Sequence, residues 1–380
     1  MQNGSRLEIT PTELADSLEG GEDIQVLDVR AEQQVAKGSV EAPRFLSTVG
    51  SVIMNLADPS EVGIDRHTRV AVVCGHGNSS LTVAAHLANL GFQALSLQGG
   101  MAAWTDLLRE RILPTPAGFD RLIQFDRIGK GALGYLVVSG DEALVVDPSR
   151  DWQTWAAAAE AAGARLVGVA DTHIHADYIS GGPALSAALG VPYYLHPADA
   201  VFPYDGTPGV IEFEPIGDGD TLSVGESAIT VHHTPGHTLG SVCFALGERA
   251  VLTGDFLFVG SIGRPDLADL AEEWTGYLWT SLNTARGAWP RQAVAYPGHY
   301  ASAEERNADL SVGRTLATLF ETNPALRFAD EAEFRAFVDA GVSTPPEAYR
   351  TIKAINVGLA MVSPREVEVL EAGKNECALG

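Results

Sequence analysis

Short apolar runs alternate with helix-like segments over the first hundred residues. Ile24–Val29 and Val70–Val73 are brief apolar runs bounded by polar residues, which predicts buried strands. Leu81–Leu90 predicts a helix that stops at Gly91. Alternation of this kind is typical of a mainly parallel sheet covered by helices, so we expect such a domain at the start of the chain.

The pattern breaks between Trp104 and Phe119, where charged residues are followed by two prolines. Such a stretch predicts an interdomain linker, which we place at 111–120. A length of 380 residues also favours two domains over one core. We therefore expect domains at 1–110 and 121–380.

Strands and helices are again mixed in the second half of the chain. Strand-like runs cover 134–138, 143–146 and 166–170, an alanine-rich helix is expected near 151–163, strands dominate from about 210 to 260, and helices follow residue 301. The sequence therefore predicts an α/β protein with a large antiparallel contribution.

Composition limits the partners. The chain has 49 acidic and 25 basic residues and a formal net charge of −24, a balance that disfavours nucleic acid and anionic membranes. No apolar run approaches the ~18 residues that span a bilayer. The first residues lack an apolar signal core, and the three cysteines are too far apart for a disulfide framework. We expect a cytoplasmic location.

Cys74 ends an apolar strand and opens a loop that leads into a helix. The loop residues are Gly75, His76, Gly77, Asn78 and Ser79. Successive backbone N–H groups and the positive end of a helix dipole would lower the pKa of the cysteine and hold an anion beside its sulfur. Such a thiolate is suited to attack a sulfane sulfur. The alternative is a buried cysteine that acts as a small apolar residue.

Three motifs in this region resemble the rhodanese sulfurtransferase family. They are Asp28-Val29-Arg30, Cys74-x-x-Gly77-x-Ser79-Ser80 and Gly99-Gly100-Met-Ala-Ala-Trp104. The resemblance spans roughly the first 110 residues and implies that Cys74 carries sulfur as a persulfide. Many rhodaneses have arginine where this loop has Ser79, and the missing cation weakens the case for thiosulfate as donor. Two roles are open for His76: it could donate a proton in catalysis, or it could be a solvated side chain of the loop.

Metal-ligating side chains gather in five short segments of the second half. The segments are Thr172–Asp177, Pro235–His237, Thr253–Asp255, Gly263–Asp266 and Pro297–His299. Imidazoles and carboxylates are the side chains that bind first-row divalent metals. They follow apolar runs here, so a β-sheet scaffold can direct them at one point.

This pattern resembles the metallo-β-lactamase superfamily over about residues 120 to 310. The motif residues are His173, His175, Asp177, His237, Asp255 and His299, in that order. The resemblance implies an αββα sandwich. Two-metal members have a histidine after the aspartate of the first motif, where this chain has Tyr178. A phenol with a pKa near 10 is a poor zinc ligand at neutral pH, so a second metal is expected to bind weakly.

Within this superfamily the chain resembles the persulfide dioxygenases, iron-containing relatives of glyoxalase II. The resemblance implies one Fe(II) held by His173, His237 and Asp255. It makes His175, Asp177 and His299 groups that orient ligands and waters, or alternative metal ligands. Two histidines and one carboxylate with open positions are typical of non-haem iron oxygenases. Arg264 would lie near the iron and bind an anionic substrate, or else form an ion pair with Asp266 that braces a loop.

Two further segments bear on the site. Tyr349–Gly358 resembles C-terminal segments of these dioxygenases, which implies that it borders the pocket. Two positions are open for Cys377: it could lie in a tail at the end of the chain, or at the rim of the site.

The two resemblances together imply a persulfide dioxygenase that oxidises a low-molecular-weight thiol persulfide to sulfite and thiol with O2. The rhodanese-like domain would transfer sulfane sulfur, in a pathway of sulfide oxidation or detoxification. Thiosulfate or sulfite are further partners, and a homodimer is compatible with the resemblance. Glutathione, coenzyme A and other small thiols all fit. The alternative is a hydrolase of thioesters with two zinc ions, similar to glyoxalase II, with a non-catalytic rhodanese domain.

Overall fold

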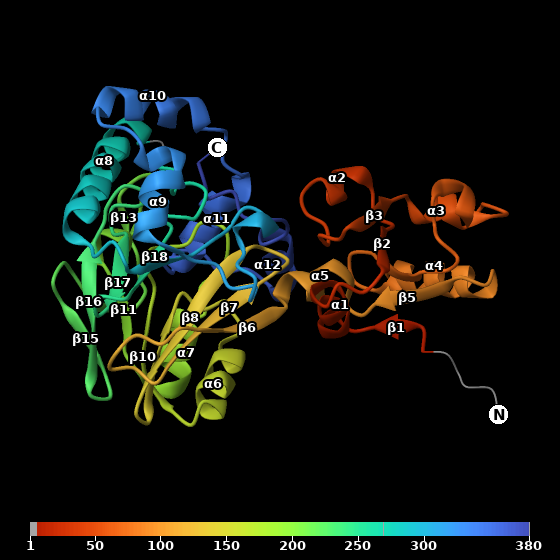
Figure 1. Ribbon diagram of the computed structural model, residues 1–380, viewed down its shortest axis with the longest axis horizontal. Helices are drawn as coiled ribbons and strands as arrows, with labels where there is room; N and C mark the ends of the chain where they lie inside the picture. The colour runs from red at the N-terminus through yellow and green to blue at the C-terminus, as the bar shows by residue number, and fades with distance from the viewer. Residues whose placement is uncertain (1–5, 269, 380) are drawn as a thin grey trace. The chain divides into compact units, whose positions relative to one another are not determined.

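The computed structural model describes residues 6–268 and 270–379 (Figure 1). The chain folds into two compact units. The first holds the chain up to Arg109 together with Arg127–Lys130 and Ala372–Lys374. The second holds Glu110–Asp126, Gly131–Glu371 and the residues from Asn375 onward.

The first unit is built on a five-stranded parallel sheet with the strand order β1-β5-β4-β2-β3. Its strands are β1 (Glu8–Ile9), β2 (Ile24–Asp28), β3 (Arg44–Ser47), β4 (Arg69–Val73) and β5 (Gln93–Leu97). Its helices are α1 (Pro11–Glu19), α2 (Glu32–Val35), α3 (Gly50–Ile53), α4 (Asn78–Asn89), α5 (Gly100–Asp106) and the 3-10 turn η1 (Pro59–Val62).

Apolar side chains of β2 and β4 are buried on both faces of this sheet. Leu27 and Val72 pack with Leu87 of α4 in one cluster. Val26 and Val73 pack in a second cluster with side chains of α1 and α5. The expectation of a mainly parallel sheet wrapped by helices is therefore confirmed, because successive strand residues face opposite layers.

The second unit contains two larger sheets. The seven-stranded sheet has the order β14-β11-β10-β9-β8-β7-β6, and the six-stranded sheet runs from β15 to β20 in sequence order. The first sheet uses β6 (Leu108–Leu113), β7 (Arg121–Arg127), β8 (Ala132–Ser139), β9 (Glu142–Val146), β10 (Arg165–Ala170), β11 (Tyr193–Leu195) and β14 (Glu214–Pro215). The second uses β15 (Thr221–Val224), β16 (Ser227–His233), β17 (Val242–Leu246), β18 (Ala250–Gly254), β19 (Val294–Pro297) and β20 (Arg314–Thr315). A small hairpin is formed by β12 (Val201–Phe202) and β13 (Thr207–Pro208).

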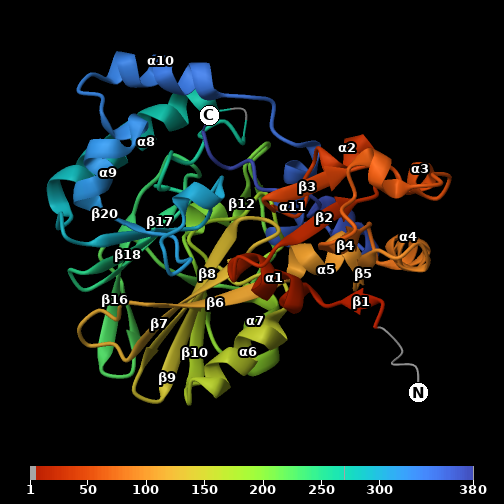
Figure 2. The ribbon, with the colours of Figure 1, turned by 45° about the vertical axis from the view of Figure 1, so that its right-hand side comes forward.

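Helices cover the outer faces of the two sheets. Figure 2 shows α6 (Trp152–Ala161) and α7 (Gly182–Leu189) beside β8 to β10 of the first sheet. The remaining helices are α8 (Ala271–Ala288), α9 (Leu316–Thr322), α10 (Glu331–Gly341), α11 (Glu347–Asn356) and α12 (Pro364–Leu370), with 3-10 turns at η2 (Pro197–Asp199), η3 (Ala303–Glu305) and η4 (Pro324–Leu326).

Apolar clusters mark the layers of this unit. Tyr135 and Val146 of the first sheet pack with Phe244 of the second, so one core lies between the sheets. A further cluster joins Val251 on the outer face of the second sheet with Leu278 of α8. The order helix, sheet, sheet, helix confirms the expected αββα sandwich.

Part of the stretch 111–120, which the sequence predicts to be a linker, belongs to a strand instead. Strand β6 covers Leu108–Leu113 and forms an edge of the seven-stranded sheet. Arg111 and Leu113 point inward and are nearly buried, while Glu110 and Ile112 are exposed. The charged side chains of an edge strand hid the apolar alternation from the sequence pattern.

No helix in the described ranges is both long enough and apolar enough to cross a membrane. Strands β18 and β19 are parallel neighbours in the second sheet. Side chains that follow these two strands therefore emerge at the same edge, where Asp255 and His299 lie.

Candidate functional site

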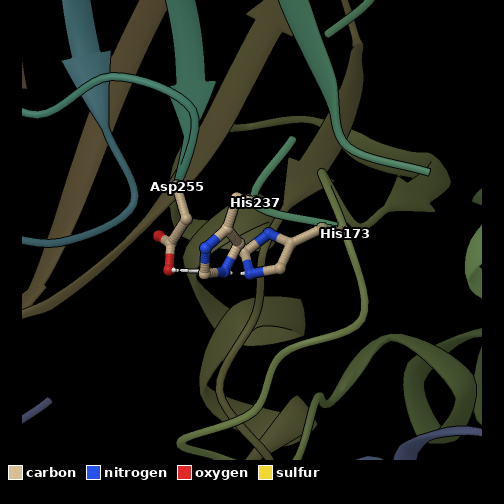
Figure 3. Close-up of side chains that lie close together, drawn as sticks. All are labelled: His173, His237 and Asp255. Atoms are coloured by element: carbon tan, nitrogen blue, oxygen red, sulfur yellow. Dashed lines mark ion pairs between the residues drawn. The ribbon is translucent and has the colours of Figure 1, made fainter. Parts of the chain in front are cut away.

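Three buried side chains meet at one edge of the two-sheet unit (Figure 3). His173 follows β10, His237 lies between β16 and β17, and Asp255 directly follows β18. The Nε2 atoms of His173 and His237 lie 3.6 and 3.5 Å from Oδ2 of Asp255. One ligand atom from each residue lies within 4.8 Å of the others, a separation suited to a shared metal ion.

Backbone contacts bring these loops together. The N–H of Val242, at the start of β17, donates to the carbonyl of Thr172 at 2.8 Å, which ties the two sheets at the site. Gly263 lies against the same place, because a Cβ there would be 1.8 Å from the carbonyl oxygen of Asp255. A side chain at 263 would therefore push Asp255 or its own loop away.

The outer nitrogens of both histidines have neutral partners. Nδ1 of His237 lies 2.9 Å from the carbonyl oxygen of Arg264, to which it donates. Nδ1 of His173 lies 3.0 Å from Oγ1 of Thr172, whose hydroxyl in turn donates to Oδ2 of Asp147 at 2.9 Å. Since each Nδ1 carries the proton, each Nε2 keeps a free lone pair that faces the cluster.

The inward atoms lack partners among the described residues. Nε2 of His173, Nε2 of His237 and Oδ2 of Asp255 are buried and make no hydrogen bond. Buried polar atoms are rarely left without a partner, and three that converge on one point call for a shared ligand. Two imidazole nitrogens and one carboxylate oxygen fit a first-row divalent cation.

Protonation supports the same fit. Burial and the neighbouring His175 hold the pKa of His173 well below its ordinary value. Burial lowers the pKa of His237 to about 4. Both imidazoles are therefore neutral at pH 7, the form that binds metals. Burial alone would raise the pKa of Asp255, but His299 beside it brings the pKa below the usual value.

His299 lies next to this cluster but is engaged differently. Its Nδ1 is 2.6 Å from Oδ1 of Asp255 and its Nε2 is 3.1 Å from Oδ2 of Asp177. Burial would lower the pKa of His299, but the two carboxylates raise it to about 10. As an imidazolium, His299 donates to both acids and has no lone pair for a metal.

Cys377, left open by the sequence, lies in the interior beside this pair. Its Sγ is within 4.8 Å of ligand atoms of Asp177 and His299, and the residue is fully buried. The carbonyl of Cys377 accepts from the N–H of Arg264 at 2.9 Å. The residue therefore belongs to the border of the site.

His175 forms a third group, with its ring centroid 4.4 Å from that of His173. Its Nε2 lies 3.3 Å from Asp147 Oδ1, 3.7 Å from Asp171 Oδ1 and 3.0 Å from the hydroxyl of Tyr178. Despite burial, the two carboxylates hold the pKa of His175 well above its ordinary value. The ring of Tyr178 stacks on His175 with centroids 4.2 Å apart.

The structure thus separates the six motif residues into three groups. His173, His237 and Asp255 converge, as the sequence analysis grouped them. Asp177 and His299 pair beside Asp255, and His175 turns towards acids that the motif did not include. Metal binding by these residues stays a prediction, and the geometry favours the first group.

Arg264 uses its guanidinium within the protein. It makes a bidentate pair with Asp266 at 2.6 and 2.7 Å and also donates to Ser343 and to the carbonyl of Glu376. Arg264 is 2% exposed. This geometry matches the alternative of a brace within a loop, and a role in binding substrate stays a prediction.

Cys74 lies at the end of β4 with its sulfur inside the loop. Sγ accepts from the N–H of Gly77 at 3.2 Å and contacts the hydroxyl of Ser80 at 3.2 Å. Burial would raise the pKa of the Cys74 thiol, but the hydroxyls of Ser80 and Ser79 and backbone N–H groups, that of His76 included, outweigh it and lower the pKa to about 7.

The close approach of two loops needs glycine. A Cβ on Gly100 would lie 2.3 Å from the carbonyl oxygen of Cys74, and Gly100 has φ +59°. Met101 at the start of α5 donates its N–H to that carbonyl at 2.8 Å. The cradle predicted around Cys74 is therefore shaped by the Gly99-Gly100 motif as well as by its own loop.

Several residues at the sites were missed from the sequence. In the first unit, Ser96 bonds the Ser80 hydroxyl at 2.8 Å and extends the chain of hydroxyls behind Cys74. In the second, Asp147 adopts φ +52°, rare for a residue other than glycine, and supports both Thr172 and His175. Only its position at the end of a strand hinted at this role.

Asp199 was also missed, and it ties the two histidine loops. Its carboxylate accepts from the N–H of Ile174 at 2.8 Å, the N–H of Gly240 at 2.6 Å and the hydroxyl of Thr238 at 2.8 Å. Ile174 follows His173, and Thr238 follows His237. Nothing in the local sequence, a 3-10 turn at 197–199, signals this function.

Comparison with known proteins places both units in described families. Residues 129–306 match the model of the metallo-beta-lactamase superfamily, and residues 10–107 match the rhodanese-like domain. A hydroxyacylglutathione hydrolase from Rhodospirillum rubrum is 30% identical over 231 residues, which cover 54% of this chain and 85% of the relative.

Solved structures also resemble the chain. A metallo-beta-lactamase from Staphylococcus aureus subsp. aureus COL has a TM-score of 0.54 and 29% identity, covering 61% of this chain and 71% of that one. ETHE1 from Myxococcus xanthus has a TM-score of 0.51 and 21% identity, covering 67% of this chain and all of that one. The second likeness concerns the fold alone.

Proposed function

Because the chain belongs to the metallo-β-lactamase superfamily and carries a rhodanese-like domain, we propose that it is a persulfide dioxygenase coupled to a sulfur carrier. The proposed reaction is R–S–SH + O2 + H2O → R–SH + H2SO3, with a low-molecular-weight thiol persulfide as substrate. The terminal sulfur is oxidised, O2 is reduced, and the thiol is released.

The observation that carries this proposal is the convergence of three atoms without hydrogen bonds. They are Nε2 of His173, Nε2 of His237 and Oδ2 of Asp255. One facial set of two imidazoles and a carboxylate is typical of mononuclear Fe(II) oxygenases. A ferrous ion held there would supply the activation of O2 that the oxidation of sulfur requires.

The protein's own groups keep this set in place. The carbonyl of Arg264 and the hydroxyl of Thr172 fix the ring orientations of the two histidines. His299 donates to Oδ1 of Asp255 and leaves Oδ2 directed at the centre. Ligands oriented in this way would raise the affinity for a metal ion.

Cys74 is proposed to carry sulfane sulfur in the first unit. Its thiolate would attack the outer sulfur of a persulfide or thiosulfate, forming an Sγ–S bond while the donor's S–S bond breaks and a thiolate or sulfite leaves. A thiol acceptor would then take up the sulfur and restore Cys74. The pKa of about 7 supports this role, because roughly half of the thiols are thiolates at neutral pH.

A test of the carrier role uses Cys74→Ser. We expect the variant to lose sulfur transfer from persulfide or thiosulfate to a thiol and to keep persulfide oxidation at the second unit. Cys243→Ser is the matched control, because Cys243 is buried in a strand and burial raises its pKa to about 12. If Cys74→Ser kept full sulfur transfer, the carrier role would be ruled out and the domain would be a docking or sensing module.

The alternative function is hydrolysis of a thioester by two zinc ions. The similarity to a hydroxyacylglutathione hydrolase favours it. That chemistry needs a second set of ligands beside the first, and here His175 and His299 are both engaged by carboxylates. We therefore rank it second.

Oxygen uptake distinguishes the two. We would supply the iron-loaded protein with persulfides of glutathione, of coenzyme A and of a simple thiol, and measure O2 consumption and sulfite. A glutathione thioester would be tested on the same sample. The dioxygenase proposal expects one sulfite per O2 with at least one persulfide. Thioester cleavage without O2 uptake would favour the hydrolase instead.

A further inference from the structure

A small cavity lies against the loops that carry two of the three converging side chains. Its volume is about 150 Å³, and its walls include Ile174 and Thr238. These residues directly follow His173 and His237 in the sequence. Apolar side chains, among them Leu239 and Trp274, make up most of the remaining wall. A concave apolar site with few polar groups is where small ligands bind.

Lys353 of α11 brings a positive charge to this cavity. The residue lines the wall and is 1% exposed. Its Nζ donates one hydrogen bond, to the carbonyl of Leu267, at a long 3.4 Å. Nζ also lies 6.0 Å from the centre of the Tyr204 ring, and, against the lowering by burial, the charge of Asp199 raises the pKa of Lys353. An ammonium group has three protons to donate, so this lysine is poorly satisfied.

A buried ammonium whose hydrogen bonding is incomplete is costly for the folded protein. Burial lowers the pKa of Lys353 to about 8, so most of the groups are still protonated at pH 7. Asp199 also lines this cavity, but its two oxygens already take three hydrogen bonds, from Ile174, Thr238 and Gly240. The ammonium therefore suits an anion that arrives with a ligand.

The volume limits the ligand. An apolar cavity of about 150 Å³ in another protein binds benzene, so this one admits roughly six non-hydrogen atoms. A three-carbon acid with a terminal sulfur has that size. Its methylene groups would contact Trp274 and Leu239, and its carboxylate would accept from Lys353.

We propose that this cavity binds a carboxylate-bearing arm of the thiol substrate, with Lys353 as the residue that selects for the acid. The inference rests on the proposed function, since it takes the thiol persulfide as the substrate whose arm is bound. It narrows the substrate class to thiols that carry a carboxylate within about three carbons of an apolar stem.

Binding of two matched thiols tests this without turnover. Iron-loaded protein would be titrated by calorimetry under argon with 3-mercaptopropionate and with its neutral amide, which differ in charge and hardly in size. Wild type is expected to prefer the acid. In Lys353→Met, affinity for the acid should fall by about tenfold to a hundredfold, the range for loss of a charged hydrogen bond, while the amide changes little. Lys374→Met is the control, an exposed lysine paired with Glu41.

The melting temperature distinguishes a loss of ligand binding from a loss of folding. Removal of a poorly paired buried ammonium should leave the melting temperature of Lys353→Met unchanged or higher. An unchanged preference for the acid in Lys353→Met, or no preference in wild type, would overturn the subsite. A protein that keeps the Lys353-dependent preference but consumes no O2 with any persulfide would contradict the dioxygenase proposal and leave the subsite standing.

Discussion

Two pairs of histidines lie within a few ångströms at the same edge of the sandwich, and their partners differ. His173 and His237 donate from Nδ1 to a hydroxyl and a carbonyl, and their Nε2 atoms face each other across Asp255. His299 lies between the carboxylates of Asp177 and Asp255, and Nε2 of His175 faces two carboxylates. The first pair is neutral and ready to bind metal, and the second pair is charged.

This difference shows that a histidine's place in a metal-binding motif does not by itself make it a metal ligand. A neutral acceptor behind a ring leaves a lone pair in front of it, whereas carboxylates beside a ring favour its protonated form. The pKa directions follow: lowered for His173 and His237, raised for His175 and His299. We therefore expect a metal to bind at His173 and His237 rather than at His175 and His299.

The largest expected effect comes from removing a member of the neutral pair. His237→Ala should take bound iron from about one per chain to nearly none, because two ligands alone hold a divalent ion weakly. Metal analysis after anaerobic purification would measure this. His67→Ala, an exposed histidine of the first unit, is the control. If His237→Ala kept about one iron per chain, the claim that the neutral pair binds the metal would be contradicted.

Tyr178→His should have the next largest effect, because it restores an imidazole beside Asp177. We expect bound metal to rise from about one towards two per chain. Tyr178→Phe removes only the hydroxyl that contacts His175 and should stay near one. A second metal in the phenylalanine variant would mean that the Tyr178 hydroxyl, and not the missing imidazole, keeps the second metal from binding.

Thr172→Val tests the neutral acceptor behind His173. The valine keeps the shape but offers no oxygen to Nδ1, so iron should bind about tenfold to a hundredfold more weakly. Competition with a chelator would give the dissociation constant. Thr172→Ser keeps the hydroxyl and should bind iron as wild type does. Equal affinities in the valine and serine variants would show that the ring needs no such partner.

The smallest effect is expected at Cys74, where hydroxyls replace the missing cation of the loop. Alkylation of Cys74 should rise with pH around a midpoint near 7. Ser80→Ala removes a donor to the thiolate, which favours the thiol and moves the midpoint upward, by about one unit. Peptide mass spectrometry would follow Cys74 itself, with Ser79→Ala as a second variant. A midpoint that stays at 7 in both would assign the shift to backbone N–H groups alone.

The sequence predicted both sheet units because strand and helix periodicity is local. Ile24–Val29 and Val70–Val73 became β2 and β4 almost residue for residue. The edge strand β6 was missed because charged residues break its alternation. Local sequence patterns therefore predicted the buried strands of the sheets but not the strand at a sheet edge.

The site was predicted in part, through motif spacing and family resemblance. That route grouped His173, His237 and Asp255, which the structure brings together. It set His175 apart from these three, but it did not find the acids that engage His175, because Asp147 comes from the end of another strand. Nor did it find Lys353, whose importance depends on a cavity that only tertiary packing creates.

The central claim is one metal ion per chain at the neutral pair. Anomalous diffraction at the iron edge, on crystals of protein purified without oxygen, would locate every bound ion. The account expects a single iron within about 2.0–2.2 Å of Nε2 of His173, Nε2 of His237 and Oδ2 of Asp255. Two ions bridged between Asp255 and Asp177, with His175 or His299 as a ligand, would contradict it.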